Sequence, residues 1–183
     1  MIMENIFSSG KKQQIADVLA NKDDRAALQK QILEKHPEDC LLAVKLNIPG
    51  PIKNNSRLKS LFEKGIDQLE KELKLSNFKI IAVKSWDKGT GCENFYLIKN
   101  TAANVKKTAV SFEDKNDLGR LFDADVLTNK KGIISSLSRK QLKQNGRKCL
   151  ICQRPAKECA RSRRHTIKEL QDRISEIYEE SFQ

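Results

Sequence analysis

The sequence has no long hydrophobic run. Its uninterrupted apolar stretches extend over only a few residues, as in 40–44, whereas a helix that crosses a bilayer needs about 20. The first ten residues also lack the cationic segment followed by an apolar one that is typical of a secretory signal. We therefore expect a cytoplasmic protein that does not span a membrane.

Aromatic residues are scarce, at 5% of the chain with a single Trp. They do not alternate with the basic residues in a way that would let nucleic-acid bases stack on them, which argues against a single-stranded nucleic acid as partner. In a reducing cytoplasm the five cysteines are expected to be thiols or metal ligands rather than disulfides. A chain of 183 residues can bury a full core without such bridges.

Positive charge is abundant: 35 Lys and Arg against 24 Asp and Glu give a net charge of +11. The segment 139–168 contains eleven bases and one acid, Glu158, so it carries +10 of this charge. A nucleic acid, an anionic membrane, a polyphosphate ligand or an acidic protein would each suit such a surface. Net charge alone does not choose among them, and a basic surface that only aids solubility is a further alternative.

The order of predicted elements indicates an α+β protein. Helices are predicted over 11–35, in one or two segments, and over 57–75, where six apolar residues share a face. Five strands are predicted, with a short helix or loop at 101–106; the strands cover 40–48, 78–86, 94–99, 107–112 and 121–127. We expect a single mixed sheet with helices packed on it.

A polar connector over 130–146 leads to the C-terminal part of the chain. Thr166 and Glu169 have the spacing of a capping box, and an apolar stripe follows from Ile167, so a final helix is predicted. We divide the chain into an α+β core over 11–135 and a basic Cys/His segment with the C-terminal helix over 136–183. The two parts are expected to pack together as one domain.

Two aspartates occupy alternate positions of a predicted strand. Phe122, Ala124 and Val126 would face the core, which leaves Asp123 and Asp125 side by side on the other face. Their Cα atoms would be about 7 Å apart, twice the rise per residue. Two carboxylates at that distance can share a magnesium ion, an arrangement that phosphoryl and nucleotidyl transfer use. The alternative is an exposed strand whose outward residues happen to be acidic.

Two further features suit a phosphate. Gly119 and Arg120, just before the aspartates, offer a backbone amide and a guanidinium group. The segment from Asn47 to Asn54 contains Pro-Gly-Pro followed by Ile and Lys53, and this rigid loop would aim the Lys53 ammonium at an anion. A plain turn explains the loop without any ligand.

A third motif combines cysteine and histidine. Cys149, Cys152, Cys159 and His165 follow the spacing Cys-x2-Cys-x6-Cys-x5-His, which suits a Cys3His zinc site. A structural zinc would hold together a segment with few apolar residues and much positive charge. Two alternatives remain open. His165 lies at a helix start among arginines and would there bind phosphate instead, or the cysteines are simply buried thiols.

Three segments together resemble the citrate lyase holo-acyl-carrier-protein synthase family, also called apo-citrate lyase phosphoribosyl-dephospho-CoA transferase. They are Asn47–Lys53, Asp117–Val126 and Arg147–His165, and the resemblance extends from about residue 23 to 177. It implies an enzyme of nucleotidyltransferase type. Such an enzyme moves the prosthetic group from 2'-(5''-triphosphoribosyl)-3'-dephospho-CoA to a serine of the citrate lyase acyl carrier protein and releases diphosphate.

The resemblance also implies roles for the residues of the aspartate strand. Asp123 and Asp125 would hold magnesium across the triphosphate, and Arg120 with Lys53 would neutralise the leaving diphosphate. The aspartate pair is similar to that of the wider nucleotidyltransferase fold. The third carboxylate usual in that fold is not identifiable in the sequence, and the candidates for it are Glu113, Asp114 and Asp117.

The remaining implied roles concern binding. Asn47 and Gly119 would contribute to the donor site. The basic cluster would bind donor phosphates or the acidic carrier protein, through Arg161, Arg163, Arg164 and His165.

Two alternatives compete with the transferase interpretation. A zinc-containing nucleic-acid-binding module explains the charge and the cysteines, but neither the aspartate strand nor the Pro-Gly-Pro loop. The other is a non-catalytic assembly factor for citrate lyase. Because a triphosphate donor and an acidic carrier protein both need a cationic surface, we interpret the +11 charge as a site for them. Neither nucleic acid nor a membrane is expected as partner.

Overall fold

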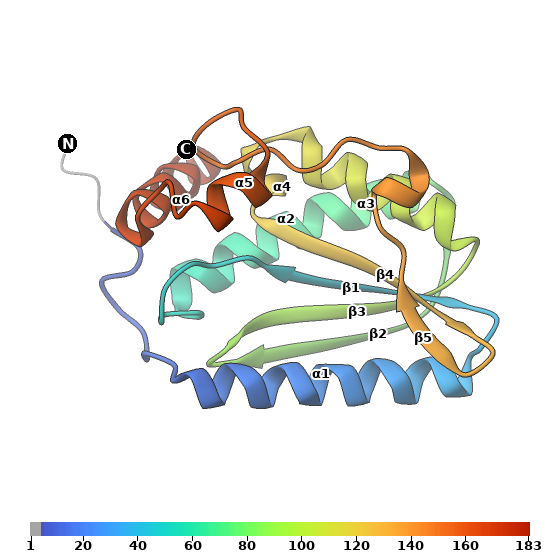
Figure 1. Cartoon of the computed structure of the whole chain (residues 1–183). Coiled ribbons are helices and arrows are strands. Elements are labelled where there is room, and N and C mark those ends of the chain that lie inside the picture. Colours follow the sequence, from blue (N-terminus) through green and yellow to red (C-terminus); the bar gives the residue numbers. More distant parts are fainter. Residues whose placement is uncertain (1–4) are drawn as a thin grey trace.

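The computed structural model describes residues 5–183, which form three layers (Figure 1). A five-stranded sheet with the order β2-β3-β1-β4-β5 lies between helix α1 on one face and helices α2 and α3 on the other. The strands are β1 Cys40–Leu46, β2 Lys79–Lys88, β3 Gly91–Lys99, β4 Phe122–Lys130 and β5 Ile133–Ser136. The helices are α1 Ile15–Lys35, α2 Ser56–Leu75, α3 Ala102–Lys115, α4 Asp117–Arg120, α5 Ala156–Arg161 and α6 Ile167–Phe182, with a 3-10 turn η1 at Lys140–Leu142.

The sheet confirms the predicted α+β class, but its strand directions differ from the prediction. All four strand pairings within the described residues are antiparallel, so the sheet is not mixed. Segment 107–112, predicted as a strand, belongs to helix α3. Its Thr, Val and Phe favour a strand by propensity. However, Val105, Ala109 and Phe112 recur at helical spacing and are all buried, and this tertiary packing decides the structure.

Helix α1 is one continuous helix, and only its second half packs closely on the sheet. Leu28 and Leu33 are buried in a small cluster with Leu41, Phe95 and other sheet residues. The apolar residues of its first half do not enter the core, since Ile15 and Leu19 remain largely exposed. This face of the sheet is therefore covered unevenly.

Helix α6 begins as predicted. The Thr166 hydroxyl accepts a hydrogen bond from the Glu169 amide, and the Glu169 carboxylate accepts one from the Thr166 amide, so the capping box is confirmed. Ile174 and Ile177 of this helix are buried in the main core, together with residues of α2, α3 and the sheet. The segment predicted as a polar connector, 130–146, contains β5 and η1. Among residues 5–183, no helix is both long and apolar enough to cross a membrane.

Candidate active site

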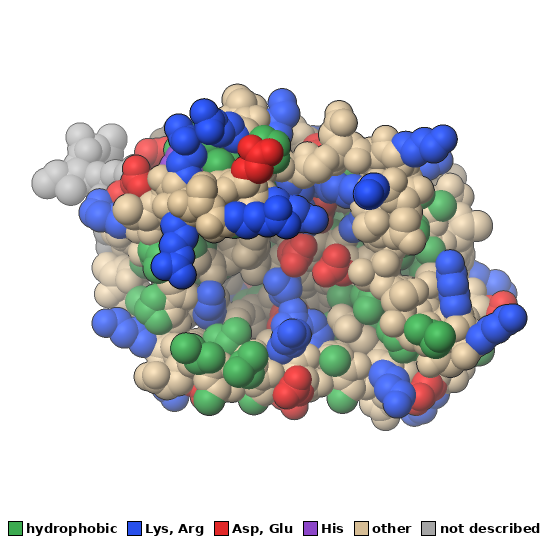
Figure 2. Space-filling model, viewed as in Figure 1, with side chains coloured by type: hydrophobic (Ala, Val, Ile, Leu, Met, Phe, Trp, Pro, Cys, Tyr) green, Lys and Arg blue, Asp and Glu red, His purple; other side chains and the backbone are tan. Residues whose placement is uncertain are grey.

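The two aspartates of β4 lie on the face of the sheet opposite the main core. Phe122, Ala124 and Val126 are fully buried, and Asp123 and Asp125 alternate with them and are half-buried, which confirms the predicted strand and its two faces. The aspartates line a hollow of about 640 Å³. Figure 2 shows a hollowed face with acidic side chains inside it and many Lys and Arg side chains around it.

Most of the other charged groups in this hollow are cationic. They come from α3, from the connector after β5 and from the start of α5, and they are Lys106, Arg139, Lys140, Arg147 and Lys157. We call this space the carboxylate hollow. A hollow with a carboxylate pair on one wall and bases on the others suits a ligand that carries both phosphates and a divalent cation.

Asp123 is held between two cations. Its carboxylate lies 3.2 Å from the Lys45 ammonium, which comes from the directly paired position of β1, and 2.8 Å from the Arg147 guanidinium. Burial by itself raises the pKa of Asp123. The charges and hydrogen bonds of Lys45 and Arg147 outweigh that effect and lower the pKa. Asp123 is therefore an ionised carboxylate at neutral pH.

Asp125 differs from its neighbour, because its carboxylate has no hydrogen bond or ion pair within residues 5–183. Burial and then the charge of Asp123 raise its pKa. The buried Lys106 ammonium, which donates to the Ala124 carbonyl at 2.8 Å, opposes this rise but does not cancel it. A half-buried carboxylate without a partner, beside a second carboxylate, is ready to accept a cation or a proton.

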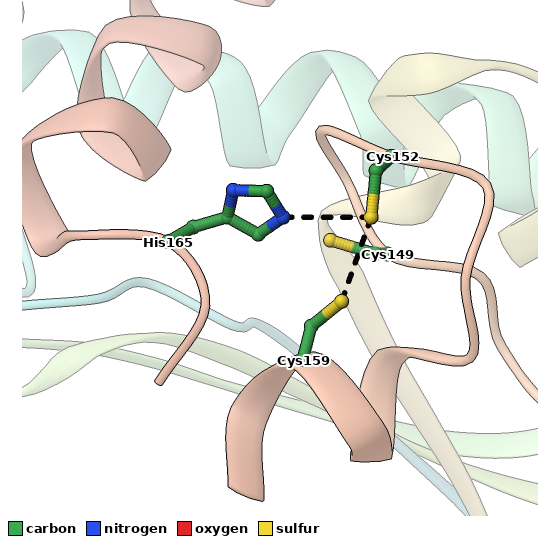
Figure 3. A group of neighbouring side chains, drawn as sticks. All are labelled: Cys149, Cys152, Cys159 and His165. Atoms are coloured by element: carbon green, nitrogen blue, oxygen red, sulfur yellow. Dashed lines mark hydrogen bonds between the residues drawn. The ribbon is translucent and has the colours of Figure 1, made fainter. Parts of the chain in front are cut away.

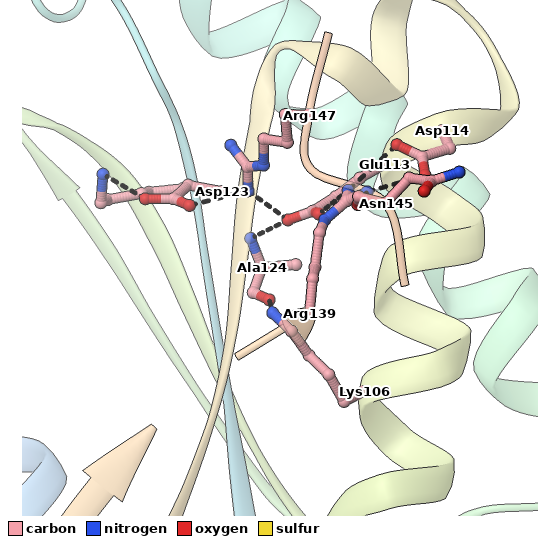
Figure 4. Close-up of polar contacts among 9 residues, drawn as sticks. Lys106, Glu113, Asp114, Asp123, Ala124, Arg139, Asn145 and Arg147 are labelled. Carbon is pink, nitrogen blue, oxygen red and sulfur yellow. Dashed lines mark hydrogen bonds and ion pairs between the residues drawn. The ribbon is translucent and has the colours of Figure 1, made fainter. Parts of the chain in front are cut away.

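Arg147 is positioned by a buried carboxylate on α3 (Figure 4). Glu113 is only 1% exposed and accepts hydrogen bonds from the Ala124 amide at 2.8 Å, from Arg139 and from Arg147. The Arg147 guanidinium therefore connects Glu113 to Asp123. Arg139 also pairs with the exposed Asp114 at 2.8 Å. This network fixes one wall of the carboxylate hollow.

The candidates for a third carboxylate are all paired with arginines. Glu113 and Asp114 bind arginines as described, and Asp117 pairs with Arg120 and Arg173. Glu93 of β3 is on the same sheet face as Asp123, with Lys45 between them in the register. It is buried and already bound by Asn21 at 2.7 Å and Arg25 at 3.3 Å.

The structure does not support the predicted phosphate contact of Gly119. Its amide donates to the Asn116 side chain at 2.8 Å and is buried within α4. A Cβ at this position would lie 2.1 Å from the Phe112 carbonyl oxygen, so close packing explains the glycine. Arg120 donates to the Cys149 carbonyl and pairs with Asp117. It lines a neighbouring hollow rather than the one with the aspartates.

That neighbouring hollow, which we call the apolar hollow, has a volume of about 690 Å³. Its walls are largely apolar and come from the end of α4, the loop before α5, and helices α5 and α6, including Leu121, Leu150, Leu170 and Ile174. Its cationic groups are Arg120, Arg147, Lys148 and Arg163, and Asn47 also lines it. Arg147 and Ala156 belong to both hollows. The two spaces are therefore adjacent and share a cationic boundary.

The Pro-Gly-Pro loop packs against α6 rather than extending freely. Gln171 donates to the Pro49 carbonyl at 3.2 Å, and Gly50 has a φ of 82° with no room for a Cβ beside Gln171. The Lys53 ammonium donates to the Ile48 carbonyl at 2.6 Å. Burial and then the charge of nearby Lys45 lower the pKa of Lys53. The loop thus places Lys53 near Lys45, in a separate small hollow, and Lys53 does not line the carboxylate hollow.

The Cys/His motif forms a cluster (Figure 3). The ligand atoms of Cys149, Cys152, Cys159 and His165 all lie within 4.8 Å of one another. His165 points its Nε2 toward the Cys152 sulfur at 3.5 Å, and this hydrogen bond lowers the pKa of the Cys152 thiol to about 6. Arg161, Arg163 and Arg164 are exposed. His165 therefore belongs to the cysteine cluster, and of the three arginines grouped with it Arg163 lines the apolar hollow beside it.

Three cations of the site were not singled out from the sequence. Lys45 follows a buried apolar run in β1, and only the pairing of β1 with β4 reveals that it faces Asp123. Arg147 and Lys106 reach the aspartates from segments distant in sequence. Arg147 is one of eleven bases in segment 139–168. The density of positive charge therefore indicated this segment as functional, but it did not distinguish Arg147 from the other bases.

Fold and site together define an α+β protein with a carboxylate pair and a basic surround suited to a phosphate-bearing ligand. The family model described as "Apo-citrate lyase phosphoribosyl-dephospho-CoA transferase" matches residues 13–181, and the chain belongs to this family. The match agrees with the resemblance found in the sequence. The alternative of a zinc-containing nucleic-acid-binding module gains no support from it.

Individual relatives agree with the family match. A "Probable apo-citrate lyase phosphoribosyl-dephospho-CoA transferase" of Streptococcus pyogenes serotype M3 is 32% identical over 179 residues, which cover 98% of this chain and 92% of the relative. An "Apo-citrate lyase phosphoribosyl-dephospho-CoA transferase" of Citrobacter koseri is 31% identical, over 89% of this chain and 87% of the relative. "Protein CitXG" of Leuconostoc mesenteroides is 34% identical over 93% of this chain but only 36% of its own length.

Proposed function

We propose that this protein transfers the phosphoribosyl-dephospho-CoA group of 2'-(5''-triphosphoribosyl)-3'-dephospho-CoA to a serine of the citrate lyase acyl carrier protein. The serine oxygen attacks the α-phosphorus of the triphosphate and forms a P–O bond. The bond from the α-phosphorus to the bridging oxygen breaks, and diphosphate leaves. The serine proton passes to a base. One observation supports this reaction above the others: an unpaired Asp125 beside an ionised Asp123, in a hollow lined by cations.

The carboxylate pair suits magnesium. Asp123 and Asp125 lie on one face at alternate positions of β4, and Asp125 has no partner within the described residues to compete with a cation. Magnesium bound there would neutralise charge on the triphosphate. Lys45 and Arg147, which hold Asp123 ionised, are close enough to bind the phosphates in addition. Asp125 is our candidate for the base that accepts the serine proton.

The two hollows suit the two parts of the donor. The triphosphate would lie in the carboxylate hollow, beside Arg147, Lys106 and Arg139. The long, largely uncharged pantetheine arm would lie along the apolar hollow, with the phosphates at its basic border. Because Arg147 belongs to both spaces, it would contact the middle of the donor, where the ribose and adenosine units connect the triphosphate to the pantetheine arm. The exposed Arg161, Arg163 and Arg164 would then be free to bind the acidic carrier protein.

The cytoplasm is the compartment that we propose for this reaction, because a reducing environment keeps cysteines as thiols and none of the five cysteines of the chain is paired in a disulfide.

Mass spectrometry of the carrier protein tests the proposed function. Incubation with this protein, magnesium and donor is expected to add one phosphoribosyl-dephospho-CoA group to a serine and to release one diphosphate. Both products should depend on donor and carrier being present together. Diphosphate release without carrier, or an unmodified carrier in the complete mixture, would contradict the transfer.

The pH dependence of transfer provides a separate prediction. Because Asp125 must be ionised to bind a cation or accept a proton, the rate should rise with pH through its raised pKa. Replacing Lys106 with Met removes a charge that lowers this pKa, so the acid limb of kcat/KM should move to higher pH. The matched variant Lys115→Met changes an exposed lysine of the same helix that pairs with Glu72, and it should leave the limb in place. An unmoved limb in Lys106→Met would exclude Asp125 as the titrating group.

A further inference from the structure

Four side chains outside the carboxylate pair are arranged as metal ligands. The Cys152 and Cys159 sulfurs are 3.5 Å apart, and His165 Nε2 is 3.5 Å from Cys152 Sγ. A tetrahedral zinc with Zn–S bonds of about 2.3 Å places its ligand atoms about 3.5 to 3.8 Å from one another. The ligand set is Cys3His, which closed structural zinc sites use. The separations within the cluster therefore fit zinc with little rearrangement.

The ligands come from three separate pieces of backbone. Cys149 and Cys152 lie on a tight loop closed by the bridge between Lys148 and Pro155, and the Cys149 amide donates to the Arg154 carbonyl at 2.8 Å. Cys159 lies on α5, and His165 lies immediately before the first capping residue of α6. Figure 3 shows the side chains of all three pieces pointing toward one centre. One ion would bind the loop, α5 and the start of α6 together.

The part of the chain that carries the cluster has few other sources of stability. Segment 147–165 contains seven bases and a single acid, so its charges repel one another. Within it, only Cys149 and Cys159 are buried. Its cysteines are free thiols, so no disulfide substitutes for a core. A short, basic segment with two buried residues needs a further source of stability, and zinc binding supplies it in many small folds.

The cluster is also continuous with the candidate active site. Arg147 precedes Cys149 by two residues and reaches Asp123 and Glu113. Arg120 donates to the carbonyl of Cys149 itself. Cys149, Cys159 and His165 all line the apolar hollow. An interaction that holds the Cys/His cluster in place therefore also positions the Arg147 guanidinium beside Asp123 and one wall of the apolar hollow.

We propose that Cys149, Cys152, Cys159 and His165 bind one structural zinc ion, which holds the basic segment 147–165 against the carboxylate pair. His165 is then a metal ligand and not a donor-phosphate ligand. The zinc has four protein ligands, so it takes no part in the bond exchange at phosphorus. The zinc proposal is based on the geometry of the four ligands, so it does not depend on the proposed transferase function.

Metal content tests the site without donor or carrier. Protein purified without chelator should contain about one zinc per chain by elemental analysis. Cys159→Ala should lower this content about tenfold or more, because three remaining ligands hold zinc weakly. Cys40→Ala also removes a buried thiol but lies outside the cluster, and it should keep the full complement. Less than about half an equivalent of zinc in the unaltered protein would overturn the proposal.

A second measurement covers the case in which Cys159→Ala does not fold. Metal-stripped protein of unaltered sequence, titrated with cobalt(II), should develop the thiolate-to-cobalt absorption of a tetrahedral site and reach its end point at about one equivalent. Hydrogen exchange of segment 147–165 should slow on metal addition. A titration without this absorption would show that no such site exists.

Discussion

Replacing either aspartate of β4 with asparagine is expected to lower the rate of carrier modification by about 10²- to 10⁴-fold. Asparagine keeps the size of the side chain but cannot provide a negative charge to a cation or accept the serine proton. The rate is measured by mass spectrometry of the carrier under saturating donor. Asp24→Asn removes an exposed carboxylate of α1 that pairs with Lys88, and it should leave the rate unchanged.

The two variants should differ in stability although both lose activity. The folded-state pKa of Asp125 lies above its unfolded value, so its ionised form opposes folding at neutral pH, and Asp125→Asn should raise the melting temperature. The pKa of Asp123 is lowered, so its ionised form stabilises the fold, and this contribution is lost as pH falls through the folded pKa. Asp123→Asn should therefore lower the melting temperature at neutral pH.

The rate, and not the stability, separates a functional role from a structural one. If Asp125 were only an outward residue of the strand, its replacement would still raise the melting temperature but would leave the rate unchanged. A folded Asp123→Asn protein that modifies the carrier at the normal rate would remove the catalytic assignment and leave the assembly-factor interpretation.

The sequence predicted the aspartate strand well because a strand has a simple period. Phe122, Ala124 and Val126 place an apolar residue at every second position. The alternation of a strand therefore predicts that Asp123 and Asp125 lie on the opposite face. The Cys/His cluster was likewise predictable, since its ligands lie within seventeen consecutive residues, 149–165. In both cases the chemistry depends on local spacing.

The partners of these residues were not predictable, because they depend on which strands pair. Lys45 faces Asp123 only because β4 pairs with β1, with Lys45 opposite Asp123. The error at segment 107–112 has a related cause. Local propensity favoured a strand there, whereas packing of Val105, Ala109 and Phe112 into the core favours the helix that brings Glu113 to the site. A residue such as Glu113 acquires its role only after α3 is in place.

Glu113 should therefore be the carboxylate on which the stability of this site depends most. Glu113→Gln is expected to lower the free energy of unfolding by about 3 to 5 kcal/mol, because it leaves two partly buried arginines without their shared counter-charge. For a chain of this size that corresponds to a melting temperature lower by roughly 10 °C. Asp114→Asn is the matched control. Asp114 binds the same Arg139 but is exposed, so its loss should cost less than about 1 kcal/mol.

A double-mutant cycle shows whether the effect arises from the charge network. Arg139→Met removes one of the two cations that Glu113 neutralises, so adding it to Glu113→Gln should cost less than it does in the unaltered protein. The expected coupling free energy is about 1 to 3 kcal/mol, measured by denaturant unfolding. Arg147 retains Asp123 as a partner in these variants, so some transfer activity should survive in molecules that remain folded. Strictly additive effects would mean that Glu113 acts through Arg147 or through its bond to the Ala124 amide rather than through Arg139.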